Sequence, residues 1–444
     1  MNELDGRAVL ASATRKASLR LLPVIGIGYG LASVDRLNIS FASLSMNADL
    51  HFSATVYGLG AGLFFIGYAL CEVPSNLLLL RFGASRWLAR IMLTWGLIAA
   101  AMMFVRTPLE FYSLRFLLGV AEAGFFPGVI YYLTLWFPAR MRARAVSGFY
   151  ISLPLSATLM GSLAGWLLGL NGKWGLAGWQ WLFLLEGLPA ALFSLVILRM
   201  LPDGPAKASW LTAEEKAWLQ GQLDADSSQA HLGHSAGVMK ALLSPKVWTI
   251  GMYFFCCLTC SYAYQFSAPA MLKDATGWSV GQVGALIAGL GVAGALGMLL
   301  NGAHSDSAGE RRLHCVVPCL IMCAGFFVAS YARQPWLVVV SLGATFIAYN
   351  SMLGPALAVP MQFLAGPAAA AGVAAMNTIT MFSGFVGAAW MGVMRDATGN
   401  YDAGVRGLAA PSLAAAFIMY ALTRSLARRR AAVPAVASLA EESA

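Results

Sequence analysis

Residues 21–46 read LLPVIGIGYGLASVDRLNISFASLSM, an apolar stretch interrupted by one charged pair, Asp35-Arg36. About 20 consecutive apolar residues are enough for a helix to cross a bilayer, so the stretch predicts a membrane-spanning helix. Ionisable side chains are expensive at membrane depth, and those found there usually face a bundle interior or a water-filled cavity. The pair therefore indicates a helix that lines a functional site inside a membrane protein.

Similar stretches recur along the whole chain of 444 residues, of which 59% are hydrophobic and 11% charged. A soluble domain has about 25% charged residues. The stretches lack the alternating pattern of a transmembrane β-barrel. We therefore predict an all-α integral membrane protein with twelve transmembrane helices, at about 21–46, 55–80, 87–105, 109–137, 145–168, 179–201, 248–271, 280–301, 315–332, 337–361, 367–394 and 404–426.

The net charge of +9 does not indicate nucleic-acid binding, because the basic residues are sorted along the chain. Of the 29 lysines and arginines, 21 lie in the two tails and in alternate turns between spans. Six lie in the other turns, and two, Arg36 and Arg115, lie inside spans. Basic residues accumulate on the cytoplasmic side of membrane proteins. We therefore expect a multi-pass protein of a bacterial inner membrane, surrounded by lipid, with both termini in the cytoplasm.

One long polar interruption divides the chain. We predict a six-helix bundle in residues 1–201, a cytoplasmic linker in 202–247, a second six-helix bundle in 248–430 and a flexible tail in 431–444. Within the linker, Thr212 followed by Glu215 matches the capping box that starts many helices. We expect a short amphipathic helix there, followed by a flexible stretch.

The two predicted bundles look like repeats of each other. The sequence RFG at residues 81–83 follows the second span, and DSAGER at residues 306–311 follows the eighth. Aligning their glycines gives an offset of 226 residues, close to half the chain. Glycine allows a tight turn, and the charges can cap helix ends and pair across the cytoplasmic face. We expect conformational or gating roles for Arg81, Gly83, Asp306 and Arg311.

Two arginines and two carboxylates lie inside spans of the first bundle: Asp35, Arg36, Arg115 and Glu122. A guanidinium group stays charged and presents a planar fork that matches a carboxylate, so Arg36 and Arg115 are candidate ligands of an anionic substrate. Arg115 and Glu122 are seven residues apart, about two helical turns, and share a face. If an anion takes the place of Asp35 or Glu122 beside an arginine, the displaced carboxylate favours its protonated form. The alternative is a permanent structural ion pair of Arg36 with Asp35 or Glu122.

Other polar residues inside spans are candidates for lesser roles. Tyr68, Tyr264 and Gln265 can bond to substrate hydroxyls; the alternative for each is an interhelical hydrogen bond, worth about 0.6 kcal/mol. Glu72 and Glu186 fit structural or gating roles better than substrate contact. The seven cysteines lie in spans, and within the spans no histidine lies near them, so we interpret them as packing residues, not as a metal or redox site. We expect no cofactor and no metal.

The chain resembles a known family through motifs in its first half: DRLNISFA at 35–42, FFIGY at 64–68, EVPSN at 72–76, RFLLGVAEAGFFPG at 115–128 and WFP at 136–138. On these residues it is similar to the major facilitator superfamily, in which two six-helix repeats form the fold. Within it, the chain resembles the anion:cation symporter family, which includes tartrate, phthalate and galactonate transporters and the animal sialin group. The resemblance covers nearly the whole chain and is densest to about residue 220.

This resemblance implies roles for individual residues. The family's Asp-Arg arginine is implicated in binding the substrate carboxylate, which implies that role for Arg36, and its span-four arginine corresponds to Arg115. The resemblance also implies that Asp35 and Glu122 are the residues that take up protons. Asn377 matches an asparagine of the family that faces the substrate.

Three departures from the family pattern leave the substrate open. Ser33 stands where a tyrosine is usual, and PAL at 355–357 stands where Pro-Phe-Trp is frequent. TMFSG at 380–384 replaces a Gly-Asn-x-Gly-Gly run.

We therefore expect a monomeric transporter, not an enzyme, that imports a small organic anion such as tartrate or a sugar acid together with protons. One alternative is an exporter or exchanger of an aromatic acid or drug-like anion on the same fold. A membrane enzyme would need a nucleophile with its base, or a metal cluster, at membrane depth, and the five histidines lie in loops or at span ends. A non-transporting sensor would be expected to carry an added signalling domain.

Overall fold

The structure is a computed structural model that describes residues 3–138, 141–142, 145–146, 149, 152–231, 244–360 and 366–441. The regular elements of these residues are helices, with no strand among them. The flexible stretch expected after the linker helix falls at 232–243, outside the described residues. The chain divides into two compact units, one made of 1–232 with 265–291 and the other of 233–264 with 292–444.

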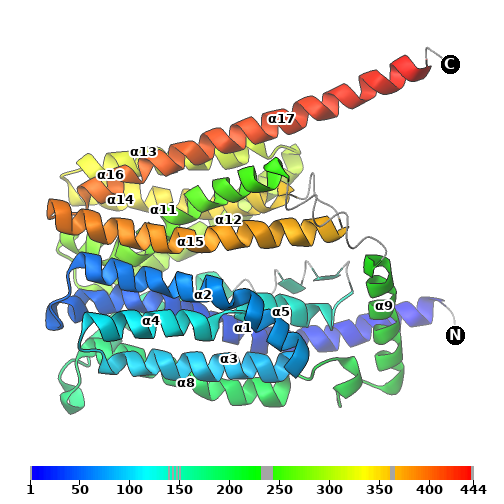
Figure 1. The fold of residues 1–444 in the computed structure, drawn as a ribbon, viewed down its shortest axis with the longest axis horizontal. Helices are drawn as coiled ribbons and strands as arrows, with labels where there is room; N and C mark the ends of the chain where they lie inside the picture. Colours follow the sequence, from blue (N-terminus) through cyan, green and yellow to red (C-terminus); the bar gives the residue numbers. More distant parts are fainter. Residues whose placement is uncertain are drawn as a thin grey trace. The chain divides into compact units, whose positions relative to one another are not determined.

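The first unit holds long helices that run nearly parallel, with α9 across their ends (Figure 1). They are α1 (Glu3–Asp49), α2 (Ala54–Phe82), α3 (Ala84–Ala101), α4 (Pro108–Glu122), α5 (Phe125–Thr134), α7 (Ser152–Leu168), α8 (Gly178–Met200) and α9 (Ala213–His231), with short 3-10 turns at Met102–Phe104, Lys173–Gly175 and Pro205–Lys207. The pairs α3–α8 and α2–α4 pack along each other, and α1 packs against α7 and α8. The helix with the Asp35-Arg36 pair is thus enclosed by neighbours.

Helices α11 (Pro245–Thr276) and α12 (Val280–Ala308) each contribute one part to either unit. The second unit continues with α13 (Arg312–Tyr331), α14 (Pro335–Ala358), α15 (Gly366–Thr398), α16 (Asp402–Gly407) and α17 (Ala409–Glu441). Here α13 packs against both α14 and α17. The α17 helix continues to Glu441, through residues where the sequence predicts a flexible tail.

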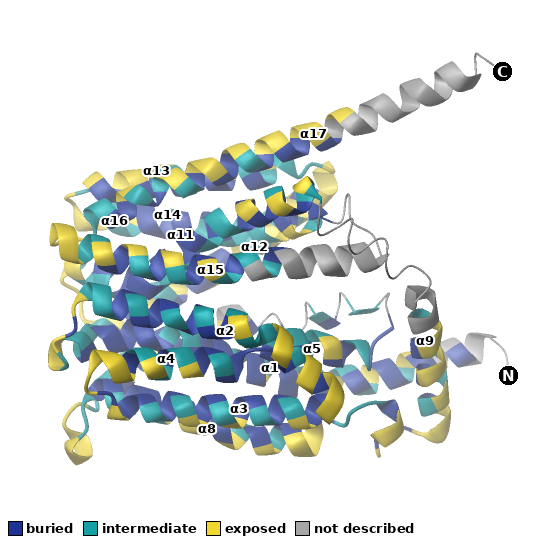
Figure 2. Cartoon of the chain, viewed as in Figure 1, coloured by how far each residue is buried: buried dark blue, intermediate teal, exposed yellow. Residues whose placement is uncertain are grey.

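Ten helices within the described residues are long and apolar enough to cross a membrane, and an eleventh apolar helix, Thr158–Leu168, is shorter. Exposed positions recur along many of the helices (Figure 2). Large apolar side chains among the exposed residues include Leu77, Leu109, Trp166, Leu192, Leu299, Leu300 and Phe417. Extensive exposed apolar surface marks a membrane or protein interface. The predicted all-helical membrane architecture is confirmed, and twelve spans are consistent with these helices.

Glycines bring α2 and α4 into backbone contact. A Cβ atom added at Gly119 of α4 would lie 1.9 Å from the carbonyl oxygen of Phe64 on α2. One added at Gly67 of α2 would lie 2.3 Å from the carbonyl oxygen of Phe116 on α4. Small residues allow such close approach between membrane helices. The side chains of α2 near Phe64 are therefore held directly beside α4.

The linker helix α9 starts at the predicted capping box, which is confirmed. Thr212 Oγ1 accepts a hydrogen bond from the Glu215 amide at 3.2 Å, and Glu215 Oε2 accepts one from the Thr212 amide at 3.0 Å. Glu215 Oε1 also accepts hydrogen bonds from Lys16 Nζ and Ser12 Oγ of α1, each at 2.7 Å. The linker helix is thereby attached to the first turns of α1, a contact that the sequence did not reveal.

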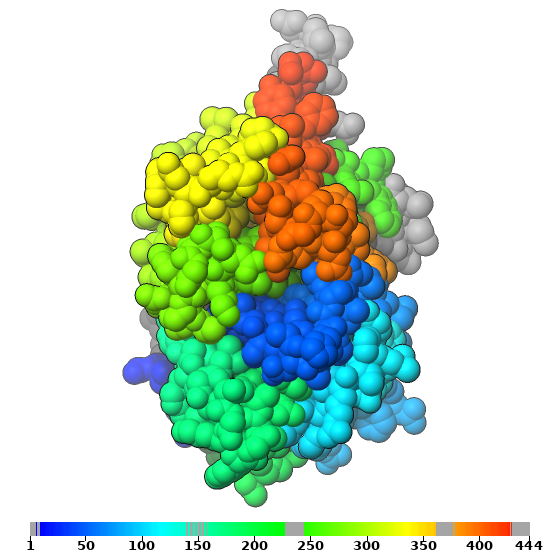
Figure 3. Space-filling model, turned by 90° about the vertical axis from the view of Figure 1, so that its left-hand side faces the viewer, coloured from blue at the N-terminus to red at the C-terminus, as the bar shows by residue number. Residues whose placement is uncertain are grey.

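The two ends of the first unit differ in charge. At one end the α1–α2 turn (blue), the α3–α4 turn (light blue to cyan) and the loop before α8 (green) lie together (Figure 3). The basic residues of these turns are Arg106 and Lys173. At the other end of the helices, the α2–α3 turn holds Arg81 and Arg86, and the first turns of α1 hold Lys16 among others.

Candidate functional site

The first unit contains an ion pair inside the membrane-spanning region. Arg36 of α1 donates a hydrogen bond from Nε to Glu122 Oε1 of α4 at 2.8 Å, and its Nη2 also contacts Oε1. The Glu122 side chain is fully buried, whereas 27% of the Arg36 side chain is exposed. Of the two carboxylates that the sequence offered, the structure pairs Arg36 with Glu122 and not with its chain neighbour Asp35.

Glu122 lies where the fourth span is interrupted. It is the last residue of α4, and Gly124, which separates α4 from α5, has a φ of +85°. A Cβ atom at Gly124 would lie 2.4 Å from Ser75 Oγ of α2, so both the backbone conformation and the packing require glycine. The sequence predicted one uninterrupted span over 109–137; the structure keeps the span and breaks its helix beside the buried carboxylate.

Arg115, about two helical turns before Glu122 on α4, is 1% exposed. Its Nη2 donates to the carbonyl oxygen of Ala61 on α2 at 3.3 Å. Within the described part of the chain it forms no ion pair, although Asp35 and Glu122 both act on it electrostatically. The structure thus brings all four predicted ionisable residues into one cluster, in which Arg36 makes the direct contact.

Aromatic rings of α2 lie beside the two arginines. The Phe64 ring centre lies 5.8 Å from the Arg36 guanidinium carbon and 5.2 Å from that of Arg115. The Tyr68 ring centre lies 5.7 Å from the Arg36 guanidinium carbon. A desolvated cation over an aromatic face gains about 2 kcal/mol, which offsets part of the cost of burying these charges. Tyr68, a predicted substrate contact, therefore does lie beside Arg36.

Asp35 faces a partner that the sequence reading overlooked. Asn38, one turn along α1, donates from Nδ2 to Asp35 Oδ1 at 3.2 Å, and both residues are buried. The second carboxylate oxygen of Asp35, like Oε2 of Glu122, is buried and has no hydrogen-bond partner in the described residues. The spacing of three residues within the DRLN motif was the available signal, because residues at that spacing share a helix face.

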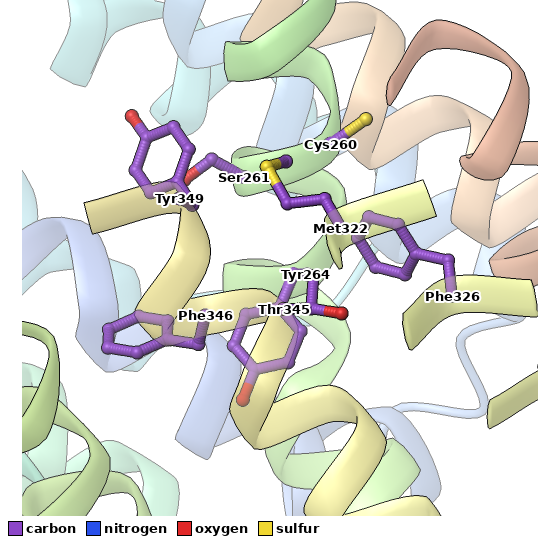
Figure 4. A pocket seen from close by; sticks show the side chains of 8 residues that line it. All are labelled: Cys260, Ser261, Tyr264, Met322, Phe326, Thr345, Phe346 and Tyr349. Carbon is purple, nitrogen blue, oxygen red and sulfur yellow. The ribbon is translucent and has the colours of Figure 1, made fainter. Parts of the chain in front are cut away.

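The other predicted substrate contacts divide between the units. Gln265 belongs to the first unit, and its neighbour Phe266 packs its ring 6.0 Å from that of Phe65 on α2. Tyr264 and Asn377 belong to the second unit, where Asn377 is half-buried on α15. The Tyr264 side chain lines a small cavity between α11, α13 and α14 (Figure 4), together with Cys260, Ser261, Met322, Phe326, Thr345, Phe346 and Tyr349.

The predicted gating residues lie at helix ends. Gly83 has a φ of +90° in the turn between α2 and α3, where Arg81 is exposed. Asp203 after α8 caps this turn, because its Oδ1 accepts a hydrogen bond from the Ser85 amide at 2.9 Å; the sequence reading missed it, although an aspartate between Pro202 and Gly204 was a signal.

In the equivalent turn of the second unit, Asp306 pairs with Arg311, which also donates to Ser305 Oγ at 2.7 Å. Glu72, half-buried on α2, lies one turn beyond Tyr68.

Comparisons with known proteins agree with this architecture. The family model described as Major Facilitator Superfamily matches residues 25–388. A protein of Agrobacterium vitis named "Putative tartrate transporter" is 42% identical over 425 residues, covering 96% of this chain and 93% of that protein. A protein of Acinetobacter baumannii named "Quinolone resistance transporter" is 38% identical, covering 94% of this chain and 96% of that protein.

Among solved structures, a bacterial homologue of the human lysosomal transporter Spinster, inward-facing and unoccupied, has the same fold. The two structures superpose with a TM-score of 0.78 at 17% sequence identity. The alignment covers 93% of this chain and 98% of the chain of the Spinster homologue. The relatives agree with the resemblance to anion:cation symporters. The chain belongs to the major facilitator superfamily of membrane transporters.

Proposed function

We propose that this transporter imports a small organic anion, a hydroxylated carboxylate such as tartrate or a sugar acid, together with protons by alternating access. One observation carries the proposal: a partly exposed arginine, Arg36, is paired with a carboxylate, Glu122, that is fully buried. A substrate carboxylate can reach Arg36, but no bulk water can solvate Glu122.

The coupling follows from competition for the arginine. A guanidinium group has five N–H donors, and two nitrogens of Arg36 contact Glu122. When a substrate carboxylate draws Arg36 toward itself, Glu122 is left buried without a cation. An isolated buried carboxylate is far more costly than its neutral acid, so Glu122 takes up a proton. Asp35, with one unpartnered oxygen, can take up a second.

Other residues contribute to substrate binding in this proposal. Arg115 and Tyr68 help Arg36 to bind the substrate. The hydroxyl end of the substrate forms hydrogen bonds with Gln265, Tyr264 and Asn377. The two six-helix bundles and the linker between them are the proposed domains. In this proposal the basic end of the first unit faces the cytoplasm, in keeping with the positive-inside rule, and both termini lie on the cytoplasmic side of a bacterial inner membrane.

The decisive experiment is uptake and counterflow in proteoliposomes that hold the purified protein. The panel contains tartrates, galactonate, glucarate, phthalate and a neutral sugar, each with and without an inside-alkaline pH gradient. We expect one acid to accumulate with the gradient, and Arg36→Ala to abolish that uptake. Arg106→Ala, in an exposed turn, is the matched control and should transport normally. Uptake that survives Arg36→Ala would contradict the proposal.

The second candidate function is export or exchange of a drug-like or aromatic anion. The similarity to a quinolone resistance transporter supports it. A quinolone and benzoate therefore belong in the panel. Counterflow of either compound that ignores the pH gradient, with no accumulation of any sugar acid, would favour exchange over symport.

A further inference from the structure

Two arginines near the start of α3, Arg86 and Arg90, have no role in the ion cluster or at the proposed substrate contacts. Arg86 is exposed and Arg90 is half-buried. Because they are four residues apart, both lie on one side of the helix. The Nε atom of Arg90 is buried and has no hydrogen-bond partner within the described residues. A buried donor without a partner costs about 1–3 kcal/mol, and more when the group is charged, so this side chain requires an acceptor.

The elements around α3 supply no carboxylate to these arginines. Helix α3 packs against α2, α4, α5, α8 and the turn Met102–Phe104. The acidic residues of these elements are Glu72, Glu110, Glu122 and Glu186, and their basic residues besides Arg115 are Arg81 and Arg199. Within the described residues neither Arg86 nor Arg90 forms an ion pair, and no carboxylate acts on Arg90.

The carboxylate that caps the α2–α3 turn is already engaged. Asp203 Oδ1 accepts a hydrogen bond from the Ser85 amide at 2.9 Å, and Asp203 Oδ2 lies 3.3 Å from Lys207 Nζ. The positive charge at the start of α3 is therefore not balanced by the described residues around it.

A pair of stacked aromatic rings holds two guanidinium groups at this turn. The Trp87 and Phe82 ring centres are 5.5 Å apart, with 10° between their planes. The guanidinium carbon of Arg90 lies 4.0 Å from the Trp87 ring centre, and that of Arg81 lies 5.7 Å from the Phe82 ring centre. Trp87 is itself fixed, because its indole N–H donates to Ser75 Oγ at 3.0 Å. Two cations are thus positioned together without a counter-ion, which favours binding of an anion.

The same side of α3 continues as exposed apolar surface. Leu93 and Leu97 follow Arg90 at spacings of three and seven residues and are 43% and 52% exposed. Helix α3 belongs to a segment long and apolar enough to cross a membrane. A lipid has its phosphate at the membrane surface and its chains in the apolar layer, and arginines at the ends of membrane helices reach that surface. A stripe of arginine followed by leucine therefore fits a phospholipid better than a soluble anion.

We propose that the start of α3 binds one anionic phospholipid, with its phosphate group between Arg86 and Arg90 and an acyl chain against Leu93 and Leu97. The planar guanidinium fork matches two phosphate oxygens, and Arg81 adds a charge of the same sign. A lipid with a net negative charge, such as phosphatidylglycerol, balances these arginines. A zwitterionic lipid brings its own cation and balances them less well. The inference does not depend on the proposed transport function.

Native mass spectrometry of the purified full chain in detergent, with phosphatidylglycerol or phosphatidylcholine added, tests the headgroup. We expect the first phosphatidylglycerol to bind more tightly than the first phosphatidylcholine. The double variant Arg86→Ala/Arg90→Ala should lose at least about tenfold in affinity for phosphatidylglycerol. Arg406→Ala is the matched control, because its guanidinium carbon also lies over a ring, that of Tyr331 at 4.3 Å, but Asp402 is on the same helix. Equal affinity of the natural protein for both lipids, or unchanged affinity in the double variant, would overturn the proposal.

Two further variants separate lipid binding from local packing. Arg90→Lys keeps the charge without the fork, so it should bind phosphatidylglycerol more tightly than Arg90→Ala does. Equal losses in these two variants would mean that disturbed packing on Trp87, and not the headgroup, causes the effect. Leu93→Ala/Leu97→Ala should weaken binding of both lipids to the same extent, because the chain contact does not depend on the headgroup. Unchanged lipid binding in that variant, or displacement of phosphatidylglycerol by an equal concentration of inorganic phosphate, would show a site for a free anion and refute the lipid assignment.

Discussion

At the scale of single residues, two carboxylate oxygens stand out beside two arginines. Oε2 of Glu122 and Oδ2 of Asp35 are both buried and lack hydrogen-bond partners in the described residues. An unsatisfied buried polar group costs about 1–3 kcal/mol. A proton on either oxygen lowers that cost once the neighbouring arginine has turned to a substrate anion. Under the proposed function, the site would bind two protons, one at each carboxylate.

The change Glu122→Gln tests this coupling. The glutamine oxygen can still accept the hydrogen bond from Arg36, so the protein should fold and exchange substrate. It cannot bind or release a proton, so we expect counterflow to persist while gradient-driven accumulation loses the contribution of one proton and keeps only that of Asp35. The control is Glu110→Gln at the start of the same helix, where the side chain only caps the backbone at 2.8–3.2 Å. Undiminished gradient-driven accumulation in Glu122→Gln would show that Glu122 does not carry a coupled proton.

The sequence identified the four ionisable residues that the structure brings together, but it left open which carboxylate pairs with Arg36. A charge within an apolar run is conspicuous, so Asp35, Arg36, Arg115 and Glu122 were all identified. The contact between Arg36 and Glu122 joins positions 86 residues apart, and it depends on how α1 and α4 pack. Asn38 was missed because asparagine within a span is a weaker signal than a charge.

At the scale of helices, the contact between α2 and α4 positions Tyr68, Arg115 and Glu122 relative to one another, since these helices carry them. Gly119→Ala places a methyl group 1.9 Å from the Phe64 carbonyl oxygen, and the rigid backbone must move. Overpacking of this kind costs about 1–3 kcal/mol, so we expect a lower unfolding temperature and a large loss of uptake. Gly26→Ala on α1 is the control, because a Cβ there meets nothing within 4 Å. Equal behaviour of the two variants would refute the close contact.

The attachment of α9 to α1 predicts a pH dependence. Burial alone would raise the pKa of Glu215, but hydrogen bonds from Lys16, the Thr212 amide and Ser12 lower it from 4.5 to about 2. A lowered pKa stabilises the folded state above pH 4.5, and this stabilisation is lost as the pH falls toward 2. Glu215→Gln should therefore lower stability at pH 7 by about 1 kcal/mol.

Thermal unfolding of the purified protein measures this difference. The difference in stability between Glu215→Gln and the natural protein should shrink steadily as the pH is lowered from 5 toward 3. Asp224→Asn, in an exposed part of α9, is the control. A difference between Glu215→Gln and the natural protein that stays constant with pH would show that the ion pair with Lys16 does not account for it.

Helix ends were predictable only where a local motif encodes them. Thr212 and Glu215 form the capping box that their spacing indicated. The break between α4 and α5 was not predicted, because hydropathy is continuous through it. Its cause is the positive φ of Gly124 and the contact with Ser75 of α2, and such a contact exists only after the helices have packed.

At the scale of the whole molecule, the ionic chemistry is confined to one half of the sequence. After Lys246 every charged residue lies in a loop, a turn or near a span end. Inside the first six spans, the charges of Asp35, Arg36, Arg115 and Glu122 sum to zero when all four are ionised. Moving one net charge across the membrane costs or gains about 2.3 kcal/mol per 100 mV. A neutral cluster avoids this dependence on the membrane potential.

Charge balance therefore predicts the stoichiometry of transport. If the empty cluster is neutral, a substrate with two negative charges restores neutrality only by bringing two protons, one for Glu122 and one for Asp35. Uptake of tartrate should then be electroneutral, and its accumulation should change about a hundredfold per pH unit, tenfold for each coupled proton. Proteoliposomes with the membrane potential clamped by potassium and valinomycin measure both quantities. A monocarboxylate such as galactonate is the matched comparison and should couple to one proton. Uptake that follows the imposed potential, or the same proton number for both acids, would contradict this prediction. Either result would show that the cluster carries a net charge, empty or loaded, when the transporter changes its access from one side of the membrane to the other.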